Sequence, residues 1–531
     1  MSAMRARRSA ALVLGVAVVA GPWAASTTRT SVQAVAGVAP SADTVHDVRA
    51  GEDSRTPVAD PVLVPVELPA RQLGTVPTAE PSPPVGTSTA VATPVASGTA
   101  TAPASSTALG APLDPDEVSA VLAPLLGGGA LGAGPTPARV VDVATGEVLY
   151  DAADEPTVPA STMKVVTAAS ALRGLGPDAV LRTRAVLVNP DAEAPRVVLV
   201  GAGDPSLTSS AREVGGSGTS VRPASLRELS DATARALAVR GITRVRVGFD
   251  DSLFTGPALH PTWDPSFPRL GIVAPVSALQ VDQGRRTPNG LGRVPDPAAR
   301  AGAVFAEHLA AAGLVVRGDP RRRELGGAGT TLAAVESPTL GVLVERMLAT
   351  SDNDYAEVLG RLAAASAGEP ASFVGVARTA RAVLGDLGID TVGAEFADAS
   401  GLSRSDRLTP ELLTDLLVTR APGFGSLHSG LPVAGATGSL RTRFRTGDQR
   451  PAAGLARAKT GTLTAVTGLA GYLSRPDARL LAFAFVDGST SGAAFAARAA
   501  MDRALAAVVE CECASAPAAS DPPDPAAPTS P

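Results

Sequence analysis

The chain has 531 residues, enough for two or three domains, and carries a formal net charge of −5 from 46 basic and 51 acidic side chains. No basic cluster accompanies this balance and aromatic residues make up only 3%, which argues against a nucleic-acid partner. The histidines (His46, His260, His308 and His428) lack metal-ligand spacing, so we expect no metal and no other cofactor. Without a Gly-x-Ser-x-Gly motif a Ser-His-Asp triad is disfavoured, and His428 is interpreted as an ordinary loop or surface residue.

Residues 1–26 predict a signal peptide. Arg5, Arg7 and Arg8 precede an apolar run from Ala10 to Ala20, which is shorter than the roughly 20 residues that a membrane-spanning helix needs. An uncleaved signal anchor is the alternative, and it would be the one membrane contact that we expect. Both interpretations place the rest of the chain outside the cytoplasm, secreted into the cell wall or the periplasmic space.

The composition of residues 27–111 and 514–531 predicts that both stretches are disordered. Both stretches are rich in Pro, Ala and Ser and poor in large apolar side chains, so they cannot bury enough apolar area to offset the entropy cost of ordering. We interpret the first as a linker that gives the folded part reach, and the second as a tail. Just before the tail, Cys511 and Cys513 are interpreted as a local disulfide or as two thiols without a catalytic role.

Residues 112–175 predict the first part of a folded domain. A helix from Asp116 to Leu126 is followed by a hairpin with strands at 138–143 and 148–150. The next stretch, Pro159-Ala160-Ser161-Thr162-Met163-Lys164, predicts the entry of a helix that is expected to stop near Gly174. Two strands followed directly by a helix suit a sheet with that helix packed against it.

Ser161 and Lys164 are a candidate nucleophile and base. In the first turn of the helix, the backbone N–H of Ser161 lacks an intrahelical acceptor and can face a developing negative charge. Lys164 is three residues further on, so its side chain returns to the same face. A desolvated lysine amine can take the proton of a neighbouring serine hydroxyl. The spacing therefore predicts a Ser-x-x-Lys nucleophile with half of an oxyanion hole.

The use of lysine supports this interpretation. Of the 46 basic residues, 44 are arginines and two are lysines, Lys164 and Lys459. A guanidinium stays protonated and cannot act as a base, so lysine is expected to survive where arginine cannot replace it. Lys459 begins the motif Lys459-Thr460-Gly461-Thr462 on a predicted edge strand. Gly461 would let a ligand approach the backbone of that strand closely.

Residues 176–335 predict an inserted domain. Strands at 181–188, 196–200 and 245–249, and a helix that begins at a Ser225/Glu228 capping box, form a self-sufficient α/β pattern. Residues 336–513 then continue the first domain and end in a helix from Ala493 to Val509. Within them, Ser351-Asp352-Asn353 follows an apolar helix from Leu340 to Leu348. Three motifs thus follow one another at 161, 351 and 459, and their order is more specific than any one of them.

With these motifs the chain resembles the class C low-molecular-mass penicillin-binding proteins, which are exported D-alanyl-D-alanine carboxypeptidases and endopeptidases. The stretches Ser351-Asp352-Asn353-Asp354-Tyr355-Ala356-Glu357 and Ser400-Gly401-Leu402-Ser403-Arg404 carry the resemblance as well. It covers roughly residues 113 to 513. The fold that it implies is α/β (α+β): a transpeptidase-like domain of the penicillin-binding-protein/β-lactamase type, with an antiparallel sheet, helices on both faces and an all-helical part, interrupted by an inserted α/β domain.

The resemblance also implies a role for each matched residue. Ser161 would attack the carbonyl group between two D-alanines, with Lys164 as the general base and Ser351 as the proton relay to the leaving group. Peptidoglycan peptides are the implied substrates, and β-lactams the implied covalent inhibitors. Asn353 would bind the substrate amide, Lys459 would stay charged, and Thr460, Gly461 and Thr462 would bind the terminal carboxylate. The backbone N–H groups of Ser161 and Thr462 would form the oxyanion hole. Arg404 would contact the free carboxylate of a diamino acid, unless it is an ordinary surface arginine.

Two alternatives stay open. A β-lactamase would need an extra acid to activate the deacylating water, and no Glu-x-x-Leu-Asn stretch follows Ser161. A non-catalytic penicillin-binding sensor or wall-interaction module would keep the motifs without turnover.

Overall fold

The computed structural model describes residues 112–127, 135–152, 155–211, 222–287, 290–327, 329–419, 421–488 and 494–514. The predicted signal peptide and linker, and the predicted tail except for Ala514, lie outside the described residues. Among the described helices, none combines the length and the apolar character that crossing a membrane requires.

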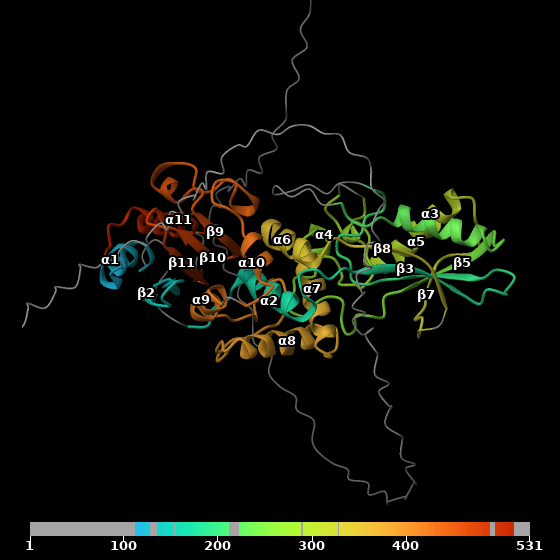
Figure 1. Ribbon diagram of the computed structural model, residues 1–531, viewed down its shortest axis with the longest axis horizontal. Coiled ribbons are helices and arrows are strands. Elements are labelled where there is room, and N and C mark those ends of the chain that lie inside the picture. The colour runs from blue at the N-terminus through green and yellow to red at the C-terminus, as the bar shows by residue number, and fades with distance from the viewer. Residues whose placement is uncertain are drawn as a thin grey trace, which may run out of the picture. The chain divides into compact units, whose positions relative to one another are not determined.

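A five-stranded antiparallel sheet brings the beginning and the end of the described chain together (Figure 1). Its order is β2-β1-β11-β10-β9, so the strand with the Lys-Thr-Gly motif lies at the edge, as predicted. The predicted hairpin is confirmed as β1 and β2. The strands are β1 (Ala138–Asp142), β2 (Val148–Ala152), β9 (Ala456–Leu463), β10 (Val466–Ser474) and β11 (Leu480–Asp487).

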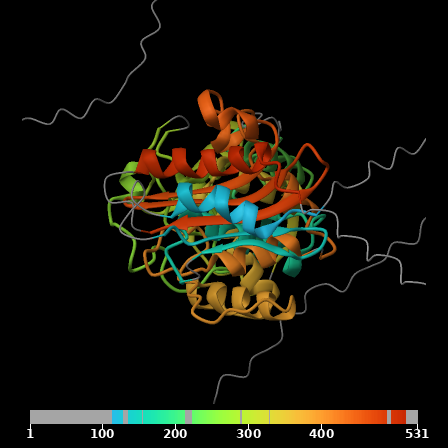
Figure 2. The same cartoon turned by 90° about the vertical axis from the view of Figure 1, so that its left-hand side faces the viewer.

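The two faces of this sheet bury side chains of different size. On β11, Phe483 and Phe485 pack with α1 (Pro115–Leu126) and α11 (Ala494–Glu510), whereas the intervening Ala484 faces the helical part. Neighbouring side chains of a strand point to opposite faces, so the pattern of large and small residues separates the two cores. Figure 2 shows α1 and α11 on one face of the sheet, with the helices from the middle of the chain on the other.

An all-helical part covers the second face of the sheet. At its centre is α2 (Met163–Leu175), which is buried from Met163 to Leu172. The predicted stop at Gly174 was wrong by two residues, because Gly176, with a φ of 80°, caps the helix. The surrounding helices are α6 (Leu340–Thr350), α7 (Asn353–Ser366), α8 (Phe373–Asp386), α9 (Pro410–Val418) and α10 (Gly425–Ser429).

A second sheet, formed between residues 182 and 336, has the order β6-β5-β4-β3-β8, with β7 paired to β5. The helices α3 (Leu226–Ala238) and α5 (Pro297–Ala311) pack on it and share its core. The side chain of Ser225 caps α3 by accepting two backbone N–H bonds. The strands are β3 (Arg182–Val188), β4 (Arg196–Val200), β5 (Arg244–Asp250), β6 (Val315–Val316), β7 (Arg321–Arg322) and β8 (Thr330–Glu336).

Part of the stretch 176–335 packs elsewhere. Trp263, Val273 and Val276 belong to the core that α2 shares with α6 and α7, and not to the core of the second sheet. The short helix α4 (Phe267–Leu270) lies between them in sequence. The domain boundaries at 176 and 335 stay a prediction, but this segment joins the helical part beside Ser161.

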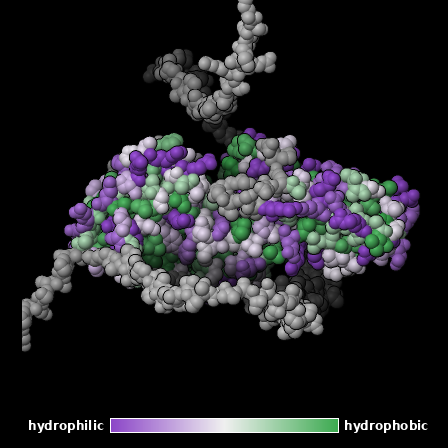
Figure 3. Space-filling model, turned by 45° about the horizontal axis from the view of Figure 1, so that its top comes forward, coloured by the Kyte–Doolittle hydropathy of each residue, from purple (hydrophilic) through white to green (hydrophobic). Residues whose placement is uncertain are grey.

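The two cysteines form the Cys511–Cys513 disulfide, which was one of the two expected states. Leu113 and Ala514 pair in an isolated bridge, so both ends of the described chain meet beside α1. In Figure 3 hydrophilic and hydrophobic residues are mixed over the face that is shown.

Asp142 and Arg479 form a buried ion pair at the end of β1, with 2.6 Å between the carboxylate and guanidinium atoms and side chains only 3% and 6% exposed. Asp142→Ala should lower the free energy of unfolding by about 3 to 5 kcal/mol, because it removes one partner of a buried pair. Glu336→Ala is the matched control, since the Arg182–Glu336 pair is exposed and its loss should cost less than about 1 kcal/mol. Urea unfolding measures both, and equal losses would contradict the prediction.

Candidate active site

Ser161 lies in a 3-10 turn, η1 (Ala160–Thr162), directly before α2. The Thr162 hydroxyl donates a hydrogen bond of 2.7 Å to the carbonyl oxygen of Pro159 and closes the turn. Ala160 has a φ of 47°, in the left-handed region that residues other than glycine rarely adopt. Such backbone strain persists only where surrounding contacts impose it, and it is often found at functional sites.

Glycines on two sides make room for this turn. A Cβ atom at Gly461 of β9 would lie 2.8 Å from the carbonyl oxygen of Pro159, and one at Gly401 would overlap the carbonyl oxygen of Ala160. Gly468 of β10 is the strand partner of Gly461, and a Cβ atom there would lie 3.2 Å from the Thr162 side chain. The sequence analysis expected Gly461 to make room for a ligand. The structure shows that it makes room for the turn that carries Ser161.

The amine of Lys164 joins three segments of the chain. Its Nζ atom donates to Ser161 Oγ at 3.0 Å, to Asn353 Oδ1 at 2.8 Å and to the carbonyl oxygen of Ser400 at 2.6 Å. Asn353 is in turn held by a 2.9 Å bond from its Nδ2 atom to the carbonyl oxygen of Ile272. The Ser-x-x-Lys motif and the asparagine of the second motif are therefore in direct contact.

Burial changes the proton affinity of Lys164. The side chain is fully buried, and loss of water around the ammonium lowers its pKa to about 8, although the charges of Asp398 and Glu357 act in the opposite direction. A lysine in water stays almost entirely protonated at neutral pH. An amine with this lowered pKa, 3.0 Å from a hydroxyl group, is able to accept its proton.

Buried carboxylates hold the loop that supplies the Ser400 carbonyl. Asp398 accepts four hydrogen bonds, from the backbone N–H groups of Ser400, Gly401 and Ser403 and from the indole of Trp263. Glu357 of α7 accepts two more, from the backbone of residues 399 and 400. These bonds fix the direction of the Ser400 carbonyl group, which in turn holds the Lys164 amine.

Two of the carboxyl groups in this cluster have raised pKa values. Burial, together with the charge of Asp398, raises the pKa of Glu357 to about 8 and that of Asp406 well above its usual range. One carboxyl oxygen of each has no hydrogen-bond partner among the described residues. A neutral carboxyl group on these two residues would avoid several negative charges in a space closed to water.

Lys459 and Ser351 form a second pair. The Lys459 amine donates to Ser351 Oγ at 2.9 Å and to the carbonyl oxygen of Thr460 at 2.7 Å. Ser351 lies at the junction of α6 and α7 with a φ of 58°, which directs its hydroxyl group toward β9. No hydrogen bond joins Ser351 to Lys164.

The pKa of Lys459 is lowered well below its usual range, first by complete burial and then by the charge of Lys164. The sequence analysis expected Lys459 to stay charged. Several carboxylates favour the protonated form of Lys164, whereas no carboxylate of the described residues acts in this way on Lys459.

A pocket of about 770 Å³ opens over these groups. Five of the residues proposed from the sequence line it: Ser161, Ser351, Asn353, Arg404 and Thr462. Both lysines are fully buried next to it. Thr460 and Gly461 do not line the pocket; the Thr460 hydroxyl is instead hydrogen-bonded to Ser439 Oγ at 2.8 Å.

Thr462 and Arg404 lie at the rim of this pocket. The Thr462 hydroxyl donates to the carbonyl oxygen of Gly461 and accepts a 3.0 Å bond from Arg498 of α11. The exposed guanidinium of Arg404 donates to the carbonyl oxygen of Thr464 at 2.7 Å, which ties the loop 400–404 to the end of β9. The carboxylate of Asp264 lines the same pocket as Arg404.

The sequence analysis missed the wall formed by residues 262–272. Thr262, Trp263, Asp264, Phe267 and Ile272 all line the pocket, although they lie within the stretch predicted as an inserted domain. The indole bond of Trp263 to Asp398 and the carbonyl group that Ile272 offers to Asn353 attach this wall to the site. No motif in this stretch signals that role.

The chain is similar to a known protein family and to several of its relatives. The model of the family "D-Ala-D-Ala carboxypeptidase 3 (S13)" matches residues 119–291 and 287–508. A carboxypeptidase of Mycobacterium tuberculosis is 38% identical over 365 residues, which is 66% of this chain and 76% of that protein. Carboxypeptidase DacB of Mycolicibacterium smegmatis is 35% identical over 383 residues, or 71% of this chain and 80% of that protein.

Solved structures share the fold. The crystal structure of penicillin binding protein 4 from Haemophilus influenzae superposes with a TM-score of 0.57 at 20% identity, covering 74% of this chain and 98% of that chain. A second structure of that protein, in complex with a β-lactam, gives a TM-score of 0.56. The predicted transpeptidase-like fold is thereby confirmed.

The lowered pKa of Lys164 can be measured directly, because the chain contains only two lysines. In protein labelled with ¹³C at lysine Cε, the resonance of Lys164 should titrate near the expected pKa of about 8. In urea both resonances should move to a pKa of about 10.4, since the unfolded chain does not desolvate the amines. The Lys164→Arg variant assigns the signals by removing one of them. A folded-state pKa above 10 for Lys164 would contradict the prediction.

Proposed function

Since the chain belongs to the D-Ala-D-Ala carboxypeptidase 3 (S13) family, we propose that it is a serine DD-peptidase, a carboxypeptidase or endopeptidase that cleaves the stem peptides of peptidoglycan through an acyl-enzyme on Ser161. One observation carries the proposal: the desolvated amine of Lys164 lies 3.0 Å from Ser161 Oγ beside an open pocket.

In the first step, Lys164 takes the hydroxyl proton while Ser161 Oγ bonds to the carbonyl carbon between two D-amino acids. The negative charge that develops on the carbonyl oxygen is stabilised by the backbone N–H groups of Ser161 and Thr462. Loss of one such donor typically costs about 3 kcal/mol of transition-state stabilisation. The C–N bond then breaks, the leaving amine takes a proton, and an ester remains on Ser161. Water hydrolyses this ester to a carboxylate and restores the serine.

Ser351 and Lys459 would deliver the proton to the leaving amine. Their 2.9 Å hydrogen bond provides a path from the Lys459 ammonium through the Ser351 hydroxyl into the pocket, which Ser351 lines. Asn353 contributes by orienting Lys164, because its Oδ1 atom accepts from the amine while its Nδ2 atom is anchored on Ile272.

Substrate binding should redistribute charge between the two lysines. A terminal carboxylate bound at Thr462, the member of this motif that lines the pocket, would lie close to Lys459 and favour its protonated form. The added positive charge on Lys459 would then lower the pKa of Lys164 further, because the two amines repel one another. In this way the bound substrate would prepare Lys164 to act as the base.

The rim of the pocket suits a zwitterionic group on the substrate. Arg404 and Asp264 line the same pocket and carry opposite charges on exposed side chains. Arg404 would bind the free carboxylate of a diamino acid in the stem peptide, and the Asp264 carboxylate would accept a hydrogen bond from the amino group of the same diamino acid.

A family that acts on peptidoglycan works outside the cytoplasm. The predicted leader at 1–26, cleaved or retained as an anchor, and the linker at 27–111 would export the enzyme and give it reach into the wall. For the folded parts we propose a transpeptidase-like domain at 112–175 and 336–513, and an inserted domain at 176–335.

Lys164→Arg should reduce the rate of acylation by a fluorescent penicillin by roughly 100-fold to 10,000-fold, the range over which general bases contribute. The guanidinium keeps the charge but cannot be deprotonated. Arg445→Lys is the matched control, because it makes the reverse exchange of cationic side chains at an exposed residue that does not line the pocket. It should be labelled at the rate of the wild type. Gel fluorescence measures labelling, and a peptide that ends in D-Ala-D-Ala reports release of D-alanine.

The same two measurements separate the alternatives. Covalent labelling together with D-alanine release supports a DD-peptidase. Rapid loss of the label without D-alanine release would indicate a β-lactamase, and stable labelling without release a sensor. If Lys164→Arg is labelled at the rate of the wild type, the proposed base is wrong.

Arg404→Gln should raise KM severalfold for a stem peptide with a free diamino-acid carboxylate, because one charge-assisted hydrogen bond to the substrate is lost. Acylation by a penicillin that lacks this group should change little. Arg445→Gln is the control for the change in net charge, since Arg445 is exposed and does not line the pocket. Steady-state kinetics with both substrates tests this, and an unchanged KM would leave Arg404 as a surface arginine.

A further inference from the structure

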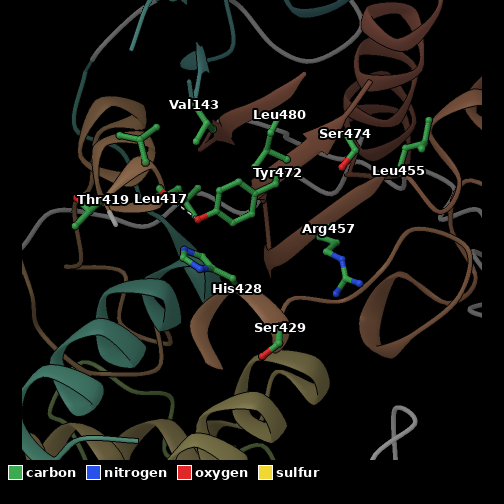
Figure 4. Close-up of a pocket in the computed structure, with 11 residues that line it drawn as sticks. Val143, Leu417, Thr419, His428, Ser429, Leu455, Arg457, Tyr472, Ser474 and Leu480 are labelled. Atoms are coloured by element: carbon green, nitrogen blue, oxygen red, sulfur yellow. Dashed lines mark hydrogen bonds between the residues drawn. The ribbon is translucent and has the colours of Figure 1, made fainter. Parts of the chain in front are cut away.

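A second pocket, of about 530 Å³, lies on the helical side of the five-stranded sheet (Figure 4). Its volume is within the range of small-molecule sites in proteins. Arg457 of β9 lines it, two residues before Lys459 and therefore roughly 7 Å away along the strand. The two pockets share no lining residue, so this is a separate site.

One end of this pocket is apolar. Leu417 at the end of α9, Leu455 before β9, and Val143 and Leu480 at the ends of strands contribute aliphatic side chains. The phenol of Tyr472 gives its proton to the carbonyl oxygen of Leu417 at 2.5 Å. The hydroxyl group of Tyr472 is thus satisfied, and its ring is left as an apolar surface at the centre of the pocket (Figure 4).

The other end is polar and positively charged. Arg457 is exposed and forms no ion pair with any described residue. In Figure 4, Arg457, His428 and Ser429 lie on one side of the Tyr472 ring, opposite Val143 and Leu480. The Ser429 hydroxyl already donates to Glu345 Oε1 at 2.5 Å, which leaves the guanidinium of Arg457 to bind a ligand.

His428 forms part of the pocket wall beside Tyr472. Its Nε2 atom is buried and has no hydrogen-bond partner in the described part of the chain. The ring is held edge-on against Tyr472, with 5.2 Å between the ring centroids. The interpretation of His428 as a loop or surface residue was wrong, since it lies half-buried in α10. The nitrogen is closed to solvent and therefore to a ligand in the pocket, so the ring serves as part of the wall beside Tyr472.

We propose that this pocket binds a small anionic amphiphile, a carboxylate on an apolar chain or ring. The carboxylate pairs with the Arg457 guanidinium, while the apolar body lies on Tyr472 between Leu417 and Leu480. Arginine suits this role because its planar guanidinium matches a carboxylate.

Calorimetric titration of the full chain tests the proposal with two probes, decanoate and naphthoate. Saturable binding at one site per chain is expected for at least one of them, and the stronger probe tells whether the natural ligand has an aliphatic or an aromatic body. Arg457→Gln should weaken binding by about tenfold, the effect of losing one charge-assisted hydrogen bond. Ser474→Phe should abolish it, because Ser474 is exposed at the pocket and a phenyl ring there would occupy the space.

Arg445→Gln is the matched control, since it makes the same change in charge at an exposed arginine that lines neither pocket. It should bind the probes like the wild type. Circular dichroism should show that all variants are folded, which is expected because the three substituted side chains are exposed. Absence of saturable binding for both probes, or equal affinity in the wild type and in Arg457→Gln and Ser474→Phe, overturns the proposal.

Discussion

Three chain segments that are far apart in sequence meet at the Nζ atom of Lys164. The turn before α2 brings Ser161, the start of α7 brings Asn353, and the loop after Asp398 brings the carbonyl oxygen of Ser400. Removing this amine from water costs enough free energy to lower its pKa to about 8. The three acceptors make that burial tolerable, because each hydrogen of the ammonium group has a partner.

The surroundings of Lys164 balance two opposing effects. Desolvation alone would favour a neutral amine, and ionised Asp398 with its neighbours would favour an ammonium. The raised pKa values of Glu357 and Asp406 limit that second effect, because a protonated carboxyl group contributes no negative charge. The same carboxyl groups accept backbone N–H bonds and shape the loop. One cluster therefore sets both the position and the proton affinity of the proposed base.

Close packing of backbone against backbone is the second requirement. The turn with Ser161 fits between β9 and the loop at residue 401 only because Gly461, Gly468 and Gly401 lack side chains. Small residues such as Ala484 on the helical face of the sheet also allow close packing there, while Phe483 and Phe485 fill the opposite face. The large residues stabilise the sheet against α11, and the small ones let the site form at its surface.

The sequence by itself determined the three motifs, their order and the catalytic candidates, because a local spacing such as Ser161 to Lys164 implies a shared helix face. The scarcity of lysine marked Lys164 and Lys459 without any structure. The edge position of β9, the β1–β2 hairpin and the capped helix α3 also followed from local patterns. Each of these depends on residues close to one another in the chain.

Only the tertiary structure decided which distant groups surround the lysines. The wall at residues 262–272, the bonds from Asp398 to the loop and the lowered pKa of Lys459 arise from contacts between segments separated by up to hundreds of residues. The pocket beside His428 and Arg457 is likewise lined by residues of α9, α10 and the five-stranded sheet, which are distant in sequence. Desolvation and electrostatic coupling depend on distance in space, and a linear pattern of residues does not specify that distance.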